Sequence, residues 1–255
     1  MSGIRRERQG SLSVLRLDKA RGNAIDESLV QELRDACREL DADDGVRGVL
    51  LASAHPKLFC PGLDLVSLVE FDRPRLQRFM TAFGEMACAL YGLRKPVVAA
   101  VSGHAVAGGC ILAMAADWRV LRRGATIGLN EVKVGVPLPL SISELLRATV
   151  APASLARVAL LGRNFADEEA LAAGLADELA DESRFEPACF ARLQEFAEKD
   201  AYSLAVTKTY LRADALRRMR AEDPAAVAQW LDGWFSPGTQ TRIRSIVGSL
   251  TRKDG

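Results

Sequence analysis

Histidine and paired cysteines are scarce in this 255-residue chain. It has two histidines and five scattered cysteines, and no two cysteines form a CxxC pair. A structural zinc site needs four such ligands at short spacings, so the composition argues against a bound metal. The start of the sequence also has no apolar h-region before a cleavage site. We therefore expect reduced thiols, a cytoplasmic location and no secretion.

An excess of one charge sign is also absent. Thirty-four Lys and Arg residues face thirty-three Asp and Glu residues, which leaves a net charge of +1. No broad electrostatic attraction to nucleic acid or to a membrane surface follows from this balance. A local basic run at Arg5, Arg6 and Arg8 is interpreted as a solvated N-terminal segment.

The sequence lacks a convincing membrane span as well. Its most apolar stretch is PVVAAVSGHAVAGGCILAMAA, residues 96–116, which approaches the length of about 20 residues that a spanning helix needs. However, the first part is short and β-branched, the last part is rich in Ala, Leu and Met, and glycines separate them. This pattern predicts a buried strand, a glycine turn and a buried helix.

Strand and helix patterns alternate over the first 150 residues or so. Apolar periodicity predicts helices after Asp26, a good N-cap, and over residues 73–93. Alternating or wholly apolar runs predict strands at residues 11–17, 48–52, 96–101, 118–121 and 125–128. The sequence therefore predicts α/β architecture, in which the loops at strand ends are the usual ligand sites.

The character of the chain changes after residue 151. Helical patterns dominate, and the one strand candidate is a brief LADEL at residues 175–179. We place a boundary near Phe196, which divides the chain into an α/β core over residues 1–195 and a helical C-terminal segment over residues 196–255.

Two loops in the α/β part share one construction. FCPGLDL, residues 59–65, and SGHAVAGGC, residues 102–110, each follow a buried strand, pass through glycine and enter an apolar helix. Glycine lets the backbone approach a ligand closely, and unpaired N–H groups at such a turn can hold a negative charge. Two such loops around one oxygen would form an oxyanion hole. Packing alone also explains such turns, so both interpretations stay open here.

Three segments together resemble the crotonase superfamily, which contains the enoyl-CoA hydratases and isomerases. They are residues 55–65, residues 102–110 and GLNEVKVG at residues 128–135, and they occur in the family's order. The resemblance extends from about residue 11 to about residue 208. It implies a ββα spiral core, acyl-CoA thioester substrates, and homotrimers or hexamers assembled through the C-terminal helices. It implies no metal and no cofactor apart from the coenzyme A of the substrate.

Individual site residues follow from the same resemblance. The family's oxyanion N–H groups fall on Leu63 and Gly108. The positions that line the coenzyme A portion of the substrate fall on Asn23, Ala24, Ile25, Asp64 and Lys208. From its place at a loop-to-helix junction, Asp64 is also expected to cap the following helix.

The position after the glycine-rich loop decides which reaction we expect. Typical hydratases of the family place one glutamate there and a second in the E-x-x-x-G segment. Here the first position is Ile111, which cannot carry a proton, and the second is Glu131. A single base can take a proton from C2 and return it at C4, which is the reaction of a Δ3,Δ2-enoyl-CoA isomerase. We expect apolar neighbours (Leu129, Val132 and Val134) to raise the pKa of Glu131.

Other interpretations remain open at this point. Glu131 could be a surface residue paired with Lys133. The chain could be an enoyl-CoA hydratase or catalyse another enolate reaction, or it could bind acyl-CoA or RNA without catalysis. His104 is expected to be a structural histidine, His55 to be exposed, and Asp117 to be a helix-end or salt-bridge residue.

Overall fold

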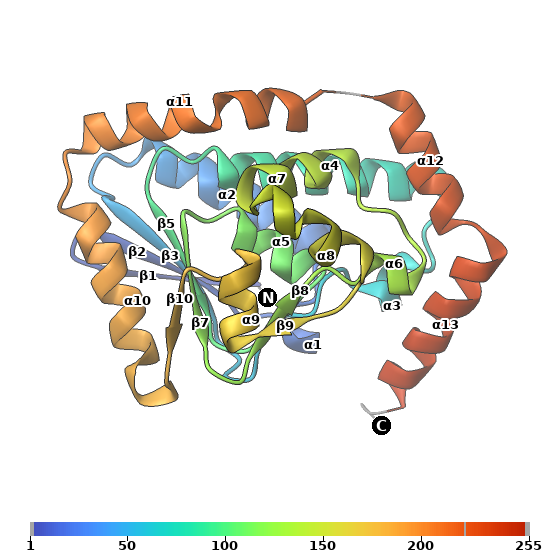
Figure 1. Ribbon diagram of the computed structural model, residues 1–255. Coiled ribbons are helices and arrows are strands. Elements are labelled where there is room, and N and C mark those ends of the chain that lie inside the picture. Colours follow the sequence, from blue (N-terminus) through green and yellow to red (C-terminus); the bar gives the residue numbers. More distant parts are fainter. Residues whose placement is uncertain (1–2, 222, 253–255) are drawn as a thin grey trace.

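Two β-sheets form the centre of the protein, which a computed structural model describes for residues 3–221 and 223–252 (Figure 1). The larger sheet has six strands in the order β1-β2-β3-β5-β7-β10, and the smaller has four in the order β4-β6-β8-β9. The strands are β1 (Ile4–Gln9), β2 (Leu12–Leu17), β3 (Gly48–Ser53), β4 (Leu58–Cys60), β5 (Val97–Val101), β6 (His104–Val106), β7 (Trp118–Arg122), β8 (Thr126–Gly128), β9 (Phe165–Ala166) and β10 (Glu178–Ala180).

Helices surround these sheets. In chain order they are α1 (Ala20–Asn23), α2 (Glu27–Ala42), α3 (Leu65–Leu68), α4 (Arg73–Tyr91), α5 (Gly108–Met114), α6 (Glu131–Val134), α7 (Leu140–Thr149), α8 (Leu155–Leu160), α9 (Asp167–Ala173), α10 (Glu182–Ala197), α11 (Ala201–Met219), α12 (Pro224–Trp234) and α13 (Pro237–Thr251). A short 3-10 turn at Pro152–Ser154 precedes α8.

The chain repeats one strand–strand–helix unit three times. Each unit has a strand in the large sheet, a short strand in the small sheet and then a helix: β3-β4-α3, β5-β6-α5 and β7-β8-α6. The strands β3, β5 and β7 are parallel neighbours, and so are β4, β6 and β8. The prediction of a ββα spiral is confirmed. Because equivalent strands are stacked, the loops that follow β4, β6 and β8 lie at the same end of the small sheet.

Both faces of the large sheet are buried. Along β3, Val49 and Leu51 belong to the main core, whereas Leu50 and Ala52 face a second core formed with α10. Successive side chains of a strand point to opposite faces, so a strand covered on both sides must be apolar throughout. In Figure 1, α10 lies on one side of the sheet, and α2, α4 and α5 lie on the other.

The predicted N-terminus of α2 is confirmed at Asp26. The Asp26 carboxylate accepts a hydrogen bond from the Leu29 N–H at 3.0 Å, a cap that typically contributes about 1 kcal/mol. The residues expected on the apolar face of this helix are buried: Leu29, Val30, Leu33, Ala36, Cys37 and Leu40. Likewise, α4 coincides with the helix predicted for residues 73–93.

The basic N-terminal run is exposed as expected, but it is also a strand. Arg5, Arg6 and Arg8 lie on β1, which pairs antiparallel with β2 at the edge of the large sheet. Ion pairs join Arg5 to Asp18 and Arg8 to Asp43. Charged side chains are a common protection for an edge strand.

The strand prediction for the second half of the chain was incomplete. The strand β9 was not predicted, and β10 begins at Glu178, later than the LADEL pattern indicated.

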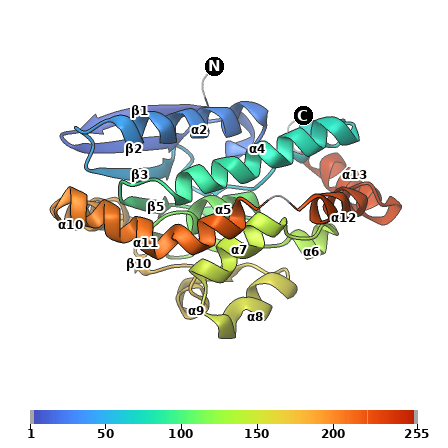
Figure 2. The same cartoon turned by 90° about the horizontal axis from the view of Figure 1, so that it is seen from above.

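The last three helices wrap around the spiral. Figures 1 and 2 show α11 crossing the molecule beside α4 and α7, and α12 and α13 continuing around the far end. Helix α12 contacts α4, and α13 contacts α3 and α6. The chain leaves α10 at Ala197 and enters α11 at Ala201, close to the boundary predicted near Phe196, and the division at that boundary stays a prediction. Within residues 3–221 and 223–252, no helix is long and apolar enough to cross a membrane.

Candidate active site

The two glycine loops are in direct contact. A Cβ atom on Gly62 would lie 3.2 Å from the Gly108 nitrogen, and a Cβ atom on Gly108 would lie 3.2 Å from the Gly62 Cα. Gly62 also has φ = 103°, a conformation that favours glycine. Gly62 and Gly108 are 46 positions apart in the sequence. Their loops can approach this closely only because neither glycine carries a side chain.

The N–H groups of Leu63 and Gly108 differ from those of their neighbours. In the described part of the chain, neither has a hydrogen-bond acceptor. Their neighbours, in contrast, are held: the Ile25 N–H donates to the Gly62 carbonyl at 2.8 Å, and the Asp64 N–H donates to the Ile25 carbonyl at 2.9 Å. Two unpaired donors on fixed backbone are what an oxyanion hole requires.

Backbone strain lies next to one of these donors. Ala107 has φ = 50° and ψ = −116°, which is costly for a residue with a Cβ atom. Its N–H donates to the Gly128 carbonyl at 2.9 Å, and its carbonyl accepts from the Ile111 N–H at 3.0 Å. These bonds hold the strained residue in place and fix the direction of the peptide group that carries the Gly108 N–H.

Glu131 has a buried carboxylate oxygen without a protein donor. Its Oε2 atom is inaccessible to solvent and has no hydrogen-bond partner among the described residues. Burial raises the pKa of Glu131 to about 7, and the backbone N–H groups of Glu131 and Asn130 oppose this to a smaller extent. A carboxyl group with such a pKa can both accept and return a proton near neutral pH.

Glu131 also lies near the glycine-rich loop. The pKa of the Cys110 thiol is raised, first by burial and next by the negative charge of Glu131. Cys110 follows Gly108 and Gly109 in α5, so the charge of Glu131 acts close to the Gly108 donor. Ile111, the next residue of α5, is 3% exposed and brings no ionisable group to this place.

Comparisons with known proteins show which family the chain resembles. The family model described as "Enoyl-CoA hydratase/isomerase" matches residues 7–236. A putative enoyl-CoA hydratase of Thermus thermophilus is 33% identical over 230 residues, covering 89% of each chain. The mitochondrial enoyl-CoA delta isomerase 1 of Rattus norvegicus is 27% identical over 225 residues, covering 86% of this chain and 78% of the relative.

The chain belongs to the enoyl-CoA hydratase/isomerase family. Its fold matches the crystal structure of human mitochondrial Δ3,Δ2-enoyl-CoA isomerase with a TM-score of 0.93, covering 99% of this chain and 100% of the other at 24% identity. The chain therefore has the crotonase fold that its sequence motifs predicted. Its relatives carry the names of both isomerases and hydratases, so the choice of reaction depends on the site itself.

The expected surroundings of Glu131 need one correction in this family member. Leu129 is 1% exposed and Val134 is half-buried, but Val132 is 42% exposed. Val132 is therefore not a buried neighbour, as the sequence had suggested. The alternative of a surface ion pair with Lys133 is not seen, since no contact between these two side chains occurs among the described ion pairs.

Residues 23–25 lie beside the Leu63 donor. Ile25 and Leu63 form a parallel β-bridge. The Asn23 amide is fully buried and donates to the Ser53 hydroxyl and the Phe59 carbonyl, both at 2.9 Å. Its side chain is thus occupied in holding the loop. Ala24, between Asn23 and Ile25, is 7% exposed.

Asp64 holds the same loop through side-chain contacts. Its carboxylate accepts from the Ser67 hydroxyl at 2.7 Å and from the Arg21 guanidinium at 3.1 Å. It stands at the N-cap position of α3, but its side chain makes no hydrogen bond to the backbone of that helix. The expected capping bond is therefore replaced by a link between the loop after β4 and Arg21.

The Lys208 side chain is engaged inside the protein, and its predicted contact with the coenzyme A portion stays a prediction. Its ammonium group is buried and donates to the Lys95 carbonyl at 2.7 Å and to the Asp117 carboxylate at 2.5 Å. Arg212 pairs with the same carboxylate at 2.8 Å. Burial lowers the pKa of Lys208 to about 8, and the charge of Asp117 opposes this. The expected salt bridge of Asp117 is confirmed, while Lys208 connects α11 to the core.

The two histidines have structural partners. The His104 Nδ1 atom lies 2.9 Å from the Thr126 hydroxyl, and the His55 Nε2 atom lies 3.0 Å from the Lys19 carbonyl. His55 is half-buried, whereas the sequence suggested exposure. The described residues contain no group of three or more His, Cys, Asp or Glu side chains that could hold a metal ion.

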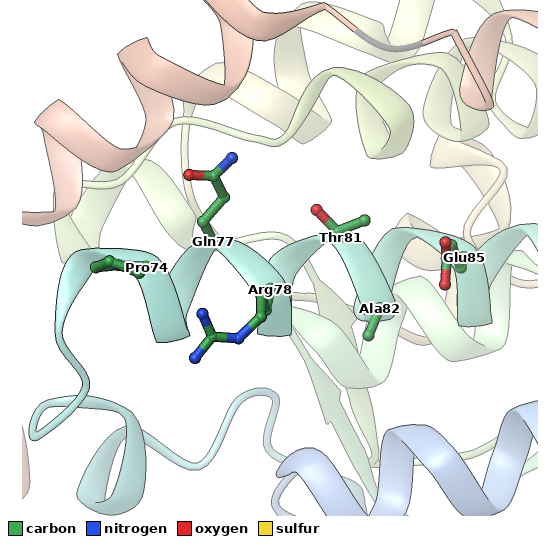
Figure 3. Close-up of a pocket in the computed structure, with 6 residues that line it drawn as sticks. All are labelled: Pro74, Gln77, Arg78, Thr81, Ala82 and Glu85. Atoms are coloured by element: carbon green, nitrogen blue, oxygen red, sulfur yellow. The ribbon is translucent and has the colours of Figure 1, made fainter.

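A cavity of about 830 Å³ lies between α4, the start of α7 and α12. Its apolar lining includes Met80, Leu140, Trp230 and Leu231. A second groove of about 410 Å³ adjoins this cavity on the outer side of α4. In Figure 3, Gln77 and Thr81 point toward the C-terminal helices, and Arg78 points to the opposite side. None of the predicted site residues lines the cavity of about 830 Å³. However, Trp230 in its lining donates a hydrogen bond from Nε1–H to the Pro137 carbonyl at 2.9 Å, and this bond connects the cavity to the segment after Glu131.

Proposed function

We propose that this protein is an enoyl-CoA isomerase that shifts a double bond of an acyl-CoA thioester from C3 to C2. The observation that carries the proposal is the combination of a Glu131 carboxylate, whose buried Oε2 atom has no hydrogen-bond partner among the described residues, with isoleucine at position 111. Adding water across a double bond is best served by two groups that polarise the water. A single base with a pKa of about 7 suits a proton that leaves one carbon and returns to another.

The proposed reaction begins with the loss of a proton from C2. The C2–H bond breaks, Glu131 takes the proton, and the electron pair moves toward the thioester oxygen to form a dienolate. The N–H groups of Leu63 and Gly108 stabilise the negative oxygen, and each such donor typically contributes about 3 kcal/mol. The electron pair then returns, the double bond forms between C2 and C3, and Glu131 delivers its proton to C4. Atoms and charges balance without any cofactor besides the coenzyme A of the substrate.

The acyl chain is proposed to extend toward the cavity between α4, α7 and α12. Support comes from the apolar lining and from the Trp230–Pro137 hydrogen bond, which links this cavity to the chain that follows Glu131. Residues 23–25, beside Leu63, are proposed to contact the coenzyme A portion. Asp64 acts indirectly in this arrangement, by holding the loop that carries Leu63.

Assembly into a homotrimer or hexamer is a further proposal. Three large side chains on α11 are strongly exposed: Tyr202 at 77%, Tyr210 at 75% and Leu211 at 78%. Burying such a surface against another copy would be favourable. Light scattering on the purified protein would measure the mass of the assembly. The cytoplasmic location stays a prediction.

The decisive experiment compares two substrates in one spectroscopic assay. We expect 3-enoyl-CoA to gain the absorbance of a conjugated thioester, and mass spectrometry to show a product of unchanged mass. We expect 2-enoyl-CoA to keep its conjugation. If 2-enoyl-CoA instead loses its conjugation and gains the mass of one water, the protein is a hydratase. If neither substrate changes, the alternative of a protein that binds acyl-CoA without catalysis is supported.

A further inference from the structure

Three side chains of the C-terminal helices bind the carbonyl groups directly after Glu131. The Thr239 hydroxyl donates to the Gly135 carbonyl at 2.8 Å, the Arg242 Nε–H donates to the Val134 carbonyl at 3.1 Å, and the Trp230 Nε1–H donates to the Pro137 carbonyl at 2.9 Å. These donors come from residues about 100 positions later in the chain. The contacts fix the backbone on the C-terminal side of the proposed base.

Glu131 depends on such outside support. It begins α6, a single turn of four residues, and one turn of helix is not stable by itself. Its buried Oε2 has no hydrogen-bond partner among the described residues, and the donors that act on the carboxylate are the backbone N–H groups of Asn130 and Glu131. The position of the carboxylate must therefore be set through the backbone, where the Gly135 N–H donates to the Glu131 carbonyl at 2.9 Å and the Val136 N–H donates to it at 3.1 Å.

Thr239 is the most strongly constrained of the three donors. It is 1% exposed, so its hydroxyl has no access to water as a replacement partner. That hydroxyl accepts from the Ser236 hydroxyl at 3.0 Å and uses its one proton on Gly135. Space around Gly135 is tight, because a Cβ atom there would lie 2.9 Å from the Thr239 hydroxyl. Gly135 has φ = 98°, so this residue both ends α6 and allows α13 to approach.

We propose that Thr239 is a positioning residue for the base: its hydrogen bond to Gly135 holds α6 so that the Glu131 carboxylate stays buried beside the glycine loops. The proposal rests on the proposed role of Glu131 as the base. It assigns α13 a function in the chemistry of the same chain, in addition to packing. Loss of the bond would let α6 shift, bring Glu131 into water and misplace it relative to C2 and C4.

The test uses the full-length protein with three changes in α13. Thr239→Val removes the hydroxyl and keeps the shape, and Thr239→Ser restores the hydroxyl. Thr241→Val is the matched control, because Thr241 lies on the same helix and its exposed hydroxyl bonds only to the Pro237 carbonyl of α13. Two readouts are taken: kcat and KM with 3-enoyl-CoA, and titration of the Glu131 carboxyl by carbon NMR, assigned by its disappearance in Glu131→Gln.

We expect Thr239→Val to lower kcat by about 10- to 100-fold with little change in KM, since small misplacements of a catalytic group cost this much. The pKa of Glu131 should fall from about 7 toward its ordinary 4.5. Thr239→Ser and Thr241→Val should match the wild type in both readouts. A merely structural role would lower thermal stability without moving the pKa of Glu131 in the folded protein.

Two outcomes would overturn the proposal. One is a folded Thr239→Val protein with unchanged kcat and unchanged titration of Glu131. If this variant does not fold, Arg242→Met decides, because Arg242 is exposed and its bond to Val134 supports the same segment. The second outcome would then be an Arg242→Met protein whose kcat and Glu131 titration equal those of the wild type. If the wild type has no isomerase activity, the proposed function fails, whereas the titration still tests the positioning by Thr239.

Discussion

Gly62 and Gly108 pack backbone against backbone, such that a Cβ atom on Gly108 would lie 3.2 Å from the Gly62 Cα. The contact joins the loop after β4 to the start of α5 and brings the N–H groups of Leu63 and Gly108 into one region. Neither N–H has an acceptor in the described part of the protein. The contact between the two glycines therefore places both proposed oxyanion donors, and it is the most sensitive point of the site.

Gly108→Ala should impair catalysis more than binding. The new Cβ atom would lie 2.9 Å from the Ile25 Cδ1 atom as well as close to Gly62, so the two loops must separate. We expect kcat to fall by about 100-fold, the typical effect of losing one oxyanion donor. Gly248→Ala is the control, because nothing lies within 4 Å of its Cβ position. Equal kcat values for both variants would show that the close contact between Gly62 and Gly108 does not set the position of the donors.

Glu131→Gln should remove turnover and keep binding. Glutamine has nearly the same shape but cannot accept the C2 proton, and a general base contributes about 100- to 10,000-fold. Calorimetry with an unreactive acyl-CoA should give the same Kd as the wild type. Glu168→Gln, a change at an exposed residue paired with Arg123, serves as the control. Unchanged turnover of Glu131→Gln would rule out this residue as the base.

The raised pKa of Glu131 should be visible in the pH dependence of activity and in the pH dependence of stability. The base must be ionised, so kcat/KM should fall about tenfold per pH unit below pH 7. Because the pKa of Glu131 is raised in the folded state from 4.5 to about 7, protonation stabilises the folded protein. This contribution is fully present below about pH 4.5 and is lost as the pH rises through about 7.

Urea unfolding of the wild type and of Glu131→Gln checks the stability part of this prediction. Above pH 7 the ionised, buried carboxylate should cost the wild type roughly 3 kcal/mol relative to its protonated form. The glutamine variant carries no such charge, so the difference in stability between the two proteins should grow between about pH 4.5 and about pH 7. A constant difference over this range would show that Glu131 titrates normally.

Met80→Trp should restrict the acyl chain. Met80 lines the cavity of about 830 Å³, and the larger indole would fill part of it. We expect kcat/KM to fall by about 10- to 100-fold for long-chain 3-enoyl-CoA and to stay unchanged for short chains. Leu161→Trp, at a leucine that is 57% exposed and far from the cavity lining in sequence, is the control. An equal loss for short and long chains would place the acyl chain elsewhere.

Lys208→Met should affect stability and leave substrate binding unchanged. Removing one partner of a buried ion pair typically costs about 3 kcal/mol, and the Lys208 ammonium is bound to Asp117 inside the protein. Thermal unfolding and the KM for an acyl-CoA measure the two effects separately. A raised KM with unchanged stability would instead support the contact with the coenzyme A portion that the family resemblance implied.

Much of the fold was readable from local patterns in the sequence. The apolar spacing after Asp26 determined α2, and the wholly apolar run around Leu50 determined a strand buried on both faces. The glycine motifs indicated where the backbone can approach closely, and Gly62 and Gly108 are in close contact. Ile111, a single apolar residue where a carboxylate was expected, was equally visible without coordinates.

Other features depend on contacts between distant parts of the chain. The burial of Lys208 could not be read from α11, because it is set by Asp117, 91 residues earlier. The link from Thr239 to Gly135 spans 104 residues, and although Gly135 belongs to the E-x-x-x-G segment, Thr239 belongs to none of the three motifs. Local spacing determined the elements and the chemical groups of this protein. Only tertiary packing decided which groups lost their water, and therefore which carboxylate has the pKa of a base.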